Sequence, residues 1–428
     1  FAVGPNVLLE VAKFRAARLV WAQVLEACGC PEATEAIFLH ARSATANLSR
    51  IDPHTNILRT TTEALSAVLG GCDGLTVLPY DTPLGLPSER ARRLARNTHL
   101  ILRDESHLDR VMDAAGGAWA LESLTAQLAE RTWSLFREIE SEGGFQRLLE
   151  TGRPQARVAD AAAARRRALA TRQEVLVGVN RYADPAEPDP APPEADLERF
   201  AARRVEALAR YRDEAPSAAV EESLGRLATI VSGIRSDTAA EMVGWSQRGG
   251  AIIEAATAAA LGGATLGRID AALQAGPASP SPGDCPLPPE RASRLVRVPP
   301  LETRRLSEPF EALREEVRAG HAAAKNGNRV GTEIFLANIG PHASYGPRLE
   351  FVRAFFALAG FWVEDDAEFE DAGTAAAAVV TSGAPVICIV STDDRYPAVV
   401  PELAAALRQA RPGARILLAG LPARRDRV

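Results

Sequence analysis

The sequence is poor in the residues and segments that mark secreted and metal-stabilised proteins. It has only 5 cysteines in 428 residues, which indicates a reducing compartment such as the cytoplasm. Cys28 and Cys30 are separated by a single residue, which is tighter than the two-residue spacing usual for metal ligands. We therefore interpret the cysteines as structural thiols.

Surplus positive charge is also missing. There are 49 Lys and Arg against 55 Asp and Glu, a net charge of −6, so no excess of cations is available to neutralise a phosphate backbone or an anionic lipid surface. No continuous apolar run is long enough to cross a bilayer. No charged segment followed by an apolar one opens the chain. We expect neither nucleic acid nor membranes as partners.

What the first 183 residues do contain is an alternation of strand and helix patterns. The apolar run at 7–25 predicts a helix packed on two sides, and a helix should open at Asp52-Pro53 and end at Gly70-Gly71. Strands are predicted at 36–43 and 74–80, and further helices at 87–106 and from Leu121 onward. Strands that alternate with helices indicate a parallel sheet.

Two proline-rich stretches divide the chain. Residues 183–195 and 276–290 hold too few apolar side chains to pack a core, so we interpret them as linkers. Between them, 195–275 is rich in Ala, Arg and Glu, which predicts helices. Arg165–Arg167 lies in an Ala-rich helical pattern, and we interpret it as a solvated helix face rather than an anion site.

The last hundred residues repeat the strand and helix alternation. Strands are predicted at 332–339, 361–364, 385–391 and 414–420, and helices at 347–359, 371–382 and 396–410. This pattern indicates a doubly wound α/β domain, in which ligands bind beyond the carboxyl ends of the strands.

Together these pieces resemble the adenosylcobalamin-dependent methylmalonyl-CoA mutase family. The resemblance is carried by LLEVAKFRAARLVWA (8–22), HTNILRTTTEALSAVLGG (54–71), LPSERARRLARNTHLIL (86–102), DAAGGAWALE (113–122) and GVNRY (178–182). It implies an α/β chain in which 1–183 is the C-terminal portion of a (β/α)8 TIM-type barrel. Residues 184–330 would be linkers and connecting helices, and 331–428 a degenerate, truncated, flavodoxin-like domain of the cobalamin-binding type. Because the chain starts at Phe1 and stops just after a strand, we expect it to be an excerpt of a longer protein.

The resemblance also identifies the residues that a cofactor would need. In family members the first strand of the last domain is followed by Asp-x-His-x-x-Gly, whose histidine binds cobalt. Aligned on Gly346, the motif places Ala343 at the ligand position and Pro341 at the aspartate position, and neither can serve. His342 is the one imidazole in this stretch, but Gly340 stands where a carboxylate would orient it. We interpret His342 as a solvated loop residue.

Other family contacts are replaced as well. The Ser-x-Leu and Gly-Gly elements that hold the nucleotide tail read Ser391-Thr392-Asp393 and Ala419-Gly420, and we expect Asp393 to bring an uncompensated charge.

The barrel part gives the same result. The stretch that faces the adenosyl group keeps Asp81 but has Leu78 and Thr82 in place of two polar contacts. The stretch at 38–46 keeps only His40, which we interpret as a hydrogen-bonded core residue.

A chain with the scaffold but without these contacts resembles the non-catalytic small subunit of heterodimeric members of the family. FLANIGP (335–341) and SEPFEALR (307–314) are similar to segments of that subunit. The resemblance implies no catalytic, cofactor-binding or metal-binding residue on this chain. A catalytic large subunit would carry adenosylcobalamin, and the complex would bind acyl-CoA and interconvert methylmalonyl-CoA and succinyl-CoA in propionate metabolism.

Two other interpretations stay open. The chain could be an active mutase that binds cobalamin through His342 or by another contact. It could also be a chaperone or regulatory module for a mutase, although such proteins usually have a nucleotide-binding domain and no Gly-x-x-x-x-Gly-Lys-Ser/Thr phosphate loop occurs here.

Overall fold

The computed structural model describes residues 1–30, 37–184, 197–214, 217–235, 245–274, 300–323, 333–365 and 367–420. The chain forms two compact units, Phe1–Pro193 with Val298–Val428, and Glu194–Arg297. Apart from Ala183 and Asp184, both proline-rich stretches lie outside the described residues.

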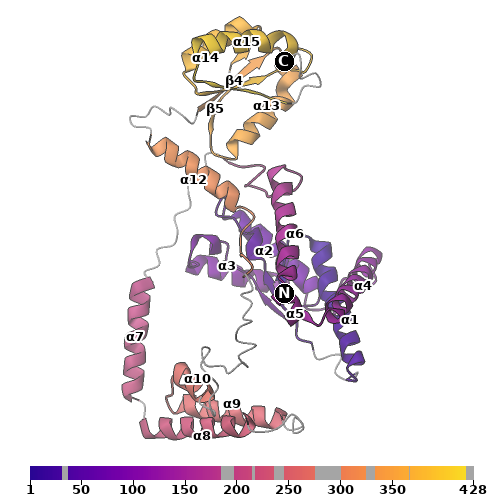
Figure 1. The fold of residues 1–428 in the computed structure, drawn as a ribbon, viewed down its shortest axis with the longest axis vertical. Helices are drawn as coiled ribbons and strands as arrows, with labels where there is room; N and C mark the ends of the chain where they lie inside the picture. The colour runs from indigo at the N-terminus through magenta and orange to yellow at the C-terminus, as the bar shows by residue number, and fades with distance from the viewer. Residues whose placement is uncertain are drawn as a thin grey trace. The chain divides into compact units, whose positions relative to one another are not determined.

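The N-terminal part contains a parallel sheet in the order β1-β2-β3 (Figure 1). Its strands are β1 (Ala2–Val3), β2 (His40–Ser43) and β3 (Gly74–Thr76), and they are followed in the chain by α1 (Val7–Ala27), α2 (Thr55–Leu69) and α3 (Glu89–Leu100). The core between sheet and helices is made of Val3, Phe14, Leu39, Ala41 and Ala67. The predicted parallel α/β alternation is confirmed, with strands shorter than expected.

The predicted start of the second helix is wrong. Asp52 has a φ of 46°, and α2 begins at Thr55 after His54, which makes no side-chain cap. The Asp52 carboxylate instead accepts a hydrogen bond from the Thr55 hydroxyl, and it lies so close to Gly178 that a Cβ there would be 2.7 Å from Asp52 Oδ2. A contact with a distant loop therefore overrides the local Asp-Pro signal. The end of α2 at Gly70, followed by Gly71 with φ 78°, is as predicted.

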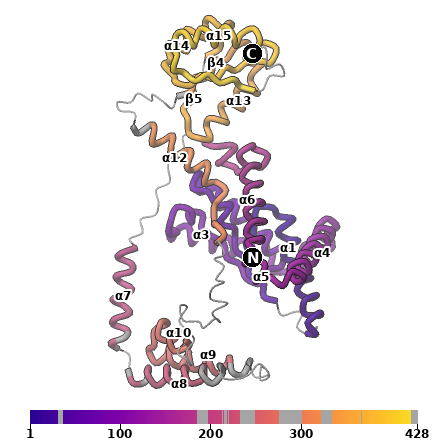
Figure 2. Tube along the Cα trace, in the orientation of Figure 1, coloured from indigo at the N-terminus to yellow at the C-terminus, as the bar shows by residue number. Residues whose placement is uncertain are grey.

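The remaining helices of this part follow α3 in the chain, and one of them packs against α1. At Leu100 the helix α3 passes into one π-turn, η4 (Ile101–Glu105), followed by α4 (Trp119–Ser141), α5 (Phe145–Glu150) and α6 (Arg153–Ala170). In both ribbon and tube, α4 lies beside α1 (Figures 1 and 2). Arg15 on α1 fixes this contact by donating to Glu122 at 2.7 Å and to Asp113 at 3.0 Å.

The second unit is helical where it is described, as predicted. It contains α7 (Leu197–Glu214), α8 (Ser217–Arg235), α9 (Trp245–Leu261) and α10 (Leu266–Gln274). Leu224, Leu227, Ala259 and Ile269 belong to its core. Ala255 and Ala259 of α9 are buried in this core. Among all helices of the described ranges, none is both long and apolar enough to cross a membrane.

The C-terminal sheet is also parallel. Its strands are β4 (Glu333–Ile339), β5 (Trp362–Glu364), β6 (Glu368–Phe369), β7 (Val386–Val390) and β8 (Arg415–Leu418), in the order β5-β4-β7-β8 with β6 also paired to β4. Helices α14 (Ala372–Ser382) and α15 (Tyr396–Ala410) cover one face, and α13 (His342–Ala357) covers the other (Figure 1). The chain reaches this sheet after α12 (Glu308–Ala323).

The four cysteines of the described residues are free thiols. Cys28 and Cys30 are exposed at the end of α1, so their interpretation as structural residues is not supported by burial. Cys388 is buried in β7, and burial raises the pKa of its thiol to about 12.

The inner face of α2 is polar at its N-terminal half, where it meets the loops that follow β2 and β3. The amide of Asn56 donates to Ser49 O at 2.8 Å and to Tyr80 O at 2.9 Å, and its Oδ1 accepts from Ser49 N at 3.0 Å. Arg59 donates to the same Oδ1 at 2.7 Å. One buried amide thus joins two loops and leaves none of its own polar groups unpaired.

Glu63 lies about two turns after Asn56 along this face and is 1% exposed. Its carboxylate accepts from Asn47 Nδ2 at 2.8 Å and from Ala44 N at 3.1 Å, so it holds the loop that leaves β2. Burial outweighs these two hydrogen bonds and raises the pKa of Glu63 to about 7.

Leu336→Ala should destabilise the C-terminal sheet. Leu336 lies at the centre of β4 and is 0% exposed, so its truncation should cost about 2–5 kcal/mol. Hydrogen exchange of β4 and β7 peptides in the full chain should become faster. Leu417→Ala, in the same sheet but 42% exposed, is the matched control, and equal acceleration in both variants would contradict the assignment of Leu336 to the core.

Stability should fall as the pH rises from about 5 to 7.5, because the folded state keeps a proton on Glu63 that the unfolded chain releases. A raised carboxyl pKa gives the unfolded state fewer bound protons in this window, so the slope of unfolding free energy against pH is negative. The shift from 4.5 to about 7 corresponds to a total loss on the order of 3 kcal/mol, most of it within this pH window.

Urea titrations at several pH values measure this loss. Glu63→Gln should flatten the slope, whereas Glu150→Gln at an exposed position should leave it unchanged. A slope that persists in Glu63→Gln would assign the titration to another group.

Candidate functional site

The stretch predicted to be a ligand loop is the first turn of a helix. After β4 ends at Ile339, Gly340 turns the chain with a φ of 103°, and α13 begins at His342 with Pro341 as its extended N-cap. Our predicted start at Pro347 is therefore wrong, because this proline lies inside the helix. Proline favours a helix start, but two prolines compete here and the earlier one prevails.

His342 is consequently not a loop residue, although it is solvent-exposed as expected. Its ring contacts the Tyr345 ring edge-on, with centroids 5.5 Å apart. No carboxylate among the described residues hydrogen-bonds to it, so nothing orients the imidazole as a metal ligand. Pro341 and Ala343 flank it on the surface and offer no donor atom in their side chains. Gly346 lies under the ring, where a Cβ would be 3.4 Å from His342 Cε1.

Ser391 and Gly420 are brought together at the carboxyl edge of the C-terminal sheet. The Ser391 hydroxyl is fully buried and donates to Ile339 O at 2.7 Å. The Tyr396 hydroxyl accepts from Ser391 N at 3.1 Å and donates to Ala419 O at 2.6 Å. These bonds join the ends of β4, β7 and β8 to one another, so the hydrogen bonds of Ser391 stabilise the sheet.

The guanidinium of Arg348, from α13, lies across this edge. It donates to Ser391 O at 2.5 Å and to Asp393 Oδ1 at 2.7 Å, and its centre is 5.3 Å from the Tyr396 ring centroid. A Cβ on Gly420 would be 3.3 Å from Arg348 Nε. The expectation that Asp393 is an uncompensated charge is wrong, because Arg348 pairs with it.

A second arginine closes the neighbouring position. A Cβ on Gly340 would lie 2.6 Å from Arg395 Nη1, so the space beyond the end of β4 is taken by a side chain of this chain. The described residues at this edge do not fit a bound cobalamin. The exposed imidazole lacks a second partner, and Arg348 and Arg395 lie where the glycines would otherwise leave room.

The sequence-predicted residues of the N-terminal part are likewise engaged locally. His40 Nε2 is 3.0 Å from Thr76 Oγ1, but His40 is exposed, so its placement in the core is wrong while its hydrogen bonding is correct. Leu39 and Ala41, its neighbours in β2, face the helices and leave His40 on the opposite face.

The other three sequence-predicted residues, Leu78, Asp81 and Thr82, lie in the loop after β3. Asp81 is buried and accepts from Ser88 N at 2.9 Å, just before α3. Thr82 donates to Pro79 O at 2.6 Å, within its own turn. Leu78 is 7% exposed and packs inside the protein. Leu78 and Thr82 present no free polar group where the resemblance expects a ligand contact, whereas the second carboxylate oxygen of Asp81, Oδ1, is buried without a hydrogen-bond partner.

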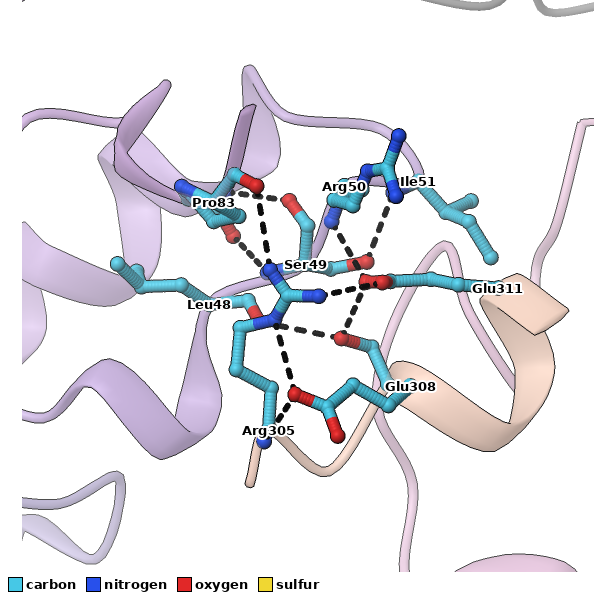
Figure 3. A network of polar contacts seen from close by, with 10 residues as sticks. Leu48, Ser49, Arg50, Ile51, Pro83, Arg305, Glu308 and Glu311 are labelled. Carbon is cyan, nitrogen blue, oxygen red and sulfur yellow. Dashed lines mark hydrogen bonds and ion pairs between the residues drawn. The ribbon is translucent and has the colours of Figure 1, made fainter. Parts of the chain in front are cut away.

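A network unforeseen from the sequence joins the segment at the start of α12 to the loops after β2 and β3 (Figure 3). Glu311, near the start of α12, accepts from Arg50 N at 2.8 Å and from Ser307 Oγ at 2.7 Å. Ser307 also approaches Leu48 O at 3.1 Å. The segment before α12 is thereby fastened to the loop after β2.

Arg305 completes the network by reaching the loop after β3. Its guanidinium donates to Pro83 O at 3.3 Å and pairs with Glu311 at 2.6 Å (Figure 3). Both side chains are largely buried, so this ion pair is strengthened by low dielectric and by its additional hydrogen bonds.

Arg348, Tyr396, Arg305 and Glu311 were missed because no motif marks them. The available signal was Asp393, since a carboxylate at a strand end attracts a nearby cation, although its side chain is 56% exposed. The identity of this cation depends on which helix packs over the edge, and that is a tertiary property.

Comparison with known proteins agrees with this architecture. A family model described as methylmalonyl-CoA mutase matches residues 1–277. The chain is 33% identical over 427 residues, 98% of its length, to the methylmalonyl-CoA mutase small subunit of Streptomyces virginiae, of which it covers 51%.

Both subunit types of Porphyromonas gingivalis are also similar. Its small subunit is 38% identical over 184 residues, covering 42% of this chain and 30% of that protein. Its large subunit is 33% identical over 232 residues, covering 54% and 32%. The chain spans about half, or less, of the length of these relatives. On the strength of the family model and the near-complete alignment, the chain belongs to the methylmalonyl-CoA mutase family.

Proposed function

We propose that this chain is the small, non-catalytic subunit of a heterodimeric, adenosylcobalamin-dependent methylmalonyl-CoA mutase of the cytoplasm. A catalytic large subunit of the same family would carry the cofactor, and the complex would bind acyl-CoA and interconvert methylmalonyl-CoA and succinyl-CoA in propionate metabolism. Relatives named as small and large subunits in one organism support a two-subunit enzyme.

We further propose that 1–183 is the C-terminal portion of a (β/α)8 barrel and 331–428 a flavodoxin-like domain of the cobalamin-binding type, joined through 184–330. The sequential order β1-β2-β3 fits neighbouring barrel strands, and β5-β4-β7-β8 fits the order 2-1-3-4 of a flavodoxin-like sheet.

The observation that carries the non-catalytic assignment is Arg348. Its guanidinium bonds to Ser391 and Asp393 and lies against Gly420, so a helix side chain takes the space that the nucleotide tail of a cofactor would need. His342, the only imidazole beside this edge in the described residues, is exposed and has no carboxylate partner. The alternative is a chain that is itself a mutase and binds cobalamin through His342.

The purified full chain should not bind adenosylcobalamin stoichiometrically. Titration of the cofactor, followed by visible absorption and by gel filtration, should leave it in the small-molecule fraction with an unshifted spectrum. His342→Ala should behave identically. Tight binding that is lost in His342→Ala would overturn the proposal and favour the alternative.

Co-expression with a mutase large subunit from the same source should give one cobalamin per heterodimer and isomerase activity. His342→Ala in this chain should leave kcat/KM within about twofold, because no transition-state contact is removed. Activity of the large subunit alone at the rate of the complex, or a second cobalamin per heterodimer, would contradict the division of roles.

A further inference from the structure

A cavity of about 530 Å³ lies in the first unit among α6, the start of α12 and the end of α13. Its wall includes Leu169 from α6, Phe310 and Leu313 from α12, and Phe355 and Phe361 from the region around the end of α13. The lining is overwhelmingly apolar, and the volume falls in the range of about 300–1,000 Å³ typical of small-molecule sites. None of the mutase contacts discussed above uses it.

Polar contacts on two sides hold the walls of the cavity. Arg314 on α12 donates to Leu358 O at 2.8 Å and is 4% exposed. Arg172, just after α6, donates to Ala354 O at 2.9 Å and lies 5.8 Å from the Phe355 ring centroid. These hydrogen bonds tie the walls to one another, so the cavity is framed before any ligand enters.

Two further arginines, Arg166 and Arg167, line the cavity, and their guanidinium groups are not used to hold its walls. Arg166 and Arg167 are exposed on α6 and form no ion pair with an acidic residue in the described ranges, while Arg165 next to them pairs with Glu174 at 3.2 Å. Apolar walls with two available cations complement a molecule that has a hydrocarbon body and an anionic head.

We propose that this cavity binds a free long-chain carboxylate, with its hydrocarbon chain among Leu169, Phe310, Leu313 and the phenylalanines of the α13 end, and its head group on Arg166 and Arg167. A carboxylate suits paired guanidinium donors in both charge and geometry. A cationic amphiphile of the same length would bury the same apolar area but would meet repulsion at the mouth. This site is independent of the mutase role proposed above.

Isothermal titration calorimetry of the full chain with dodecanoate, below its micellar concentration, tests the proposal. We expect saturable binding near one molecule per chain, and dodecyltrimethylammonium should bind at least about tenfold more weakly. Arg166→Ala/Arg167→Ala should weaken dodecanoate binding by about tenfold or more. Ala170→Trp, which adds a ring at the cavity wall from an exposed helix position, should abolish it.

The matched control is Arg131→Ala/Arg137→Ala, which removes the same charge from exposed positions of α4. It should leave dodecanoate affinity within about twofold. Non-saturable binding, equal affinity for the two amphiphiles, or unchanged affinity in Arg166→Ala/Arg167→Ala would each overturn the proposal. Because all of these substitutions lie on exposed helix surface, circular dichroism should show a folded protein in every case.

Discussion

The loops beyond the strands of the N-terminal sheet depend on one face of α2. Parallel strands end in loops whose backbone groups cannot pair with one another and must find partners. Asn56 supplies them for two loops at once, and Glu63 holds the turn that leaves β2. Removing such a side chain would leave several buried groups unpaired, at about 1–3 kcal/mol each. The side chains of α2 thus fix the loops at the carboxyl ends of these strands, independently of any ligand.

The need to pair these backbone groups explains why the resemblance to mutases includes the motif around α2 and the motif GVNRY. Asn56 and Glu63 belong to the motif around α2, and Asn180 belongs to GVNRY, where its buried amide pairs with Leu176 N at 2.7 Å and with Leu169 O and Glu174 O at 2.9 Å each. Each of these residues satisfies the chain's own backbone. The fold needs these residues whether or not a cofactor is bound. A chain can therefore keep these motifs independently of the C-terminal sheet edge, where Arg348 bonds to Ser391 and Asp393.

Sequence patterns predicted the elements better than their boundaries. Helices such as α4 and strands such as β7 follow from periodicity and apolar runs, which each segment carries within itself. The starts of α2 and α13 were misplaced because Gly178 and Pro341 decide them, one through a tertiary contact and the other through a competing local signal. His40 was assigned to the core although its alternation with Leu39 and Ala41 places it on the other face. Arg348 could not be predicted, because these two contacts come from the loop after β7, more than forty residues away.

The helix α12 contacts both α/β parts of the first unit. Glu311 fastens its start to the loops after β2 and β3, and Arg314, three residues later, fastens the same helix to Leu358 at the end of α13. Residues three apart lie on neighbouring positions of one helix face. One turn of α12 therefore contacts both the loops of the N-terminal sheet and the end of α13, which covers the C-terminal sheet. These contacts are made by buried charged groups, whose directionality fixes position more strictly than apolar packing does. These contacts link the two α/β parts through the chain's own side chains.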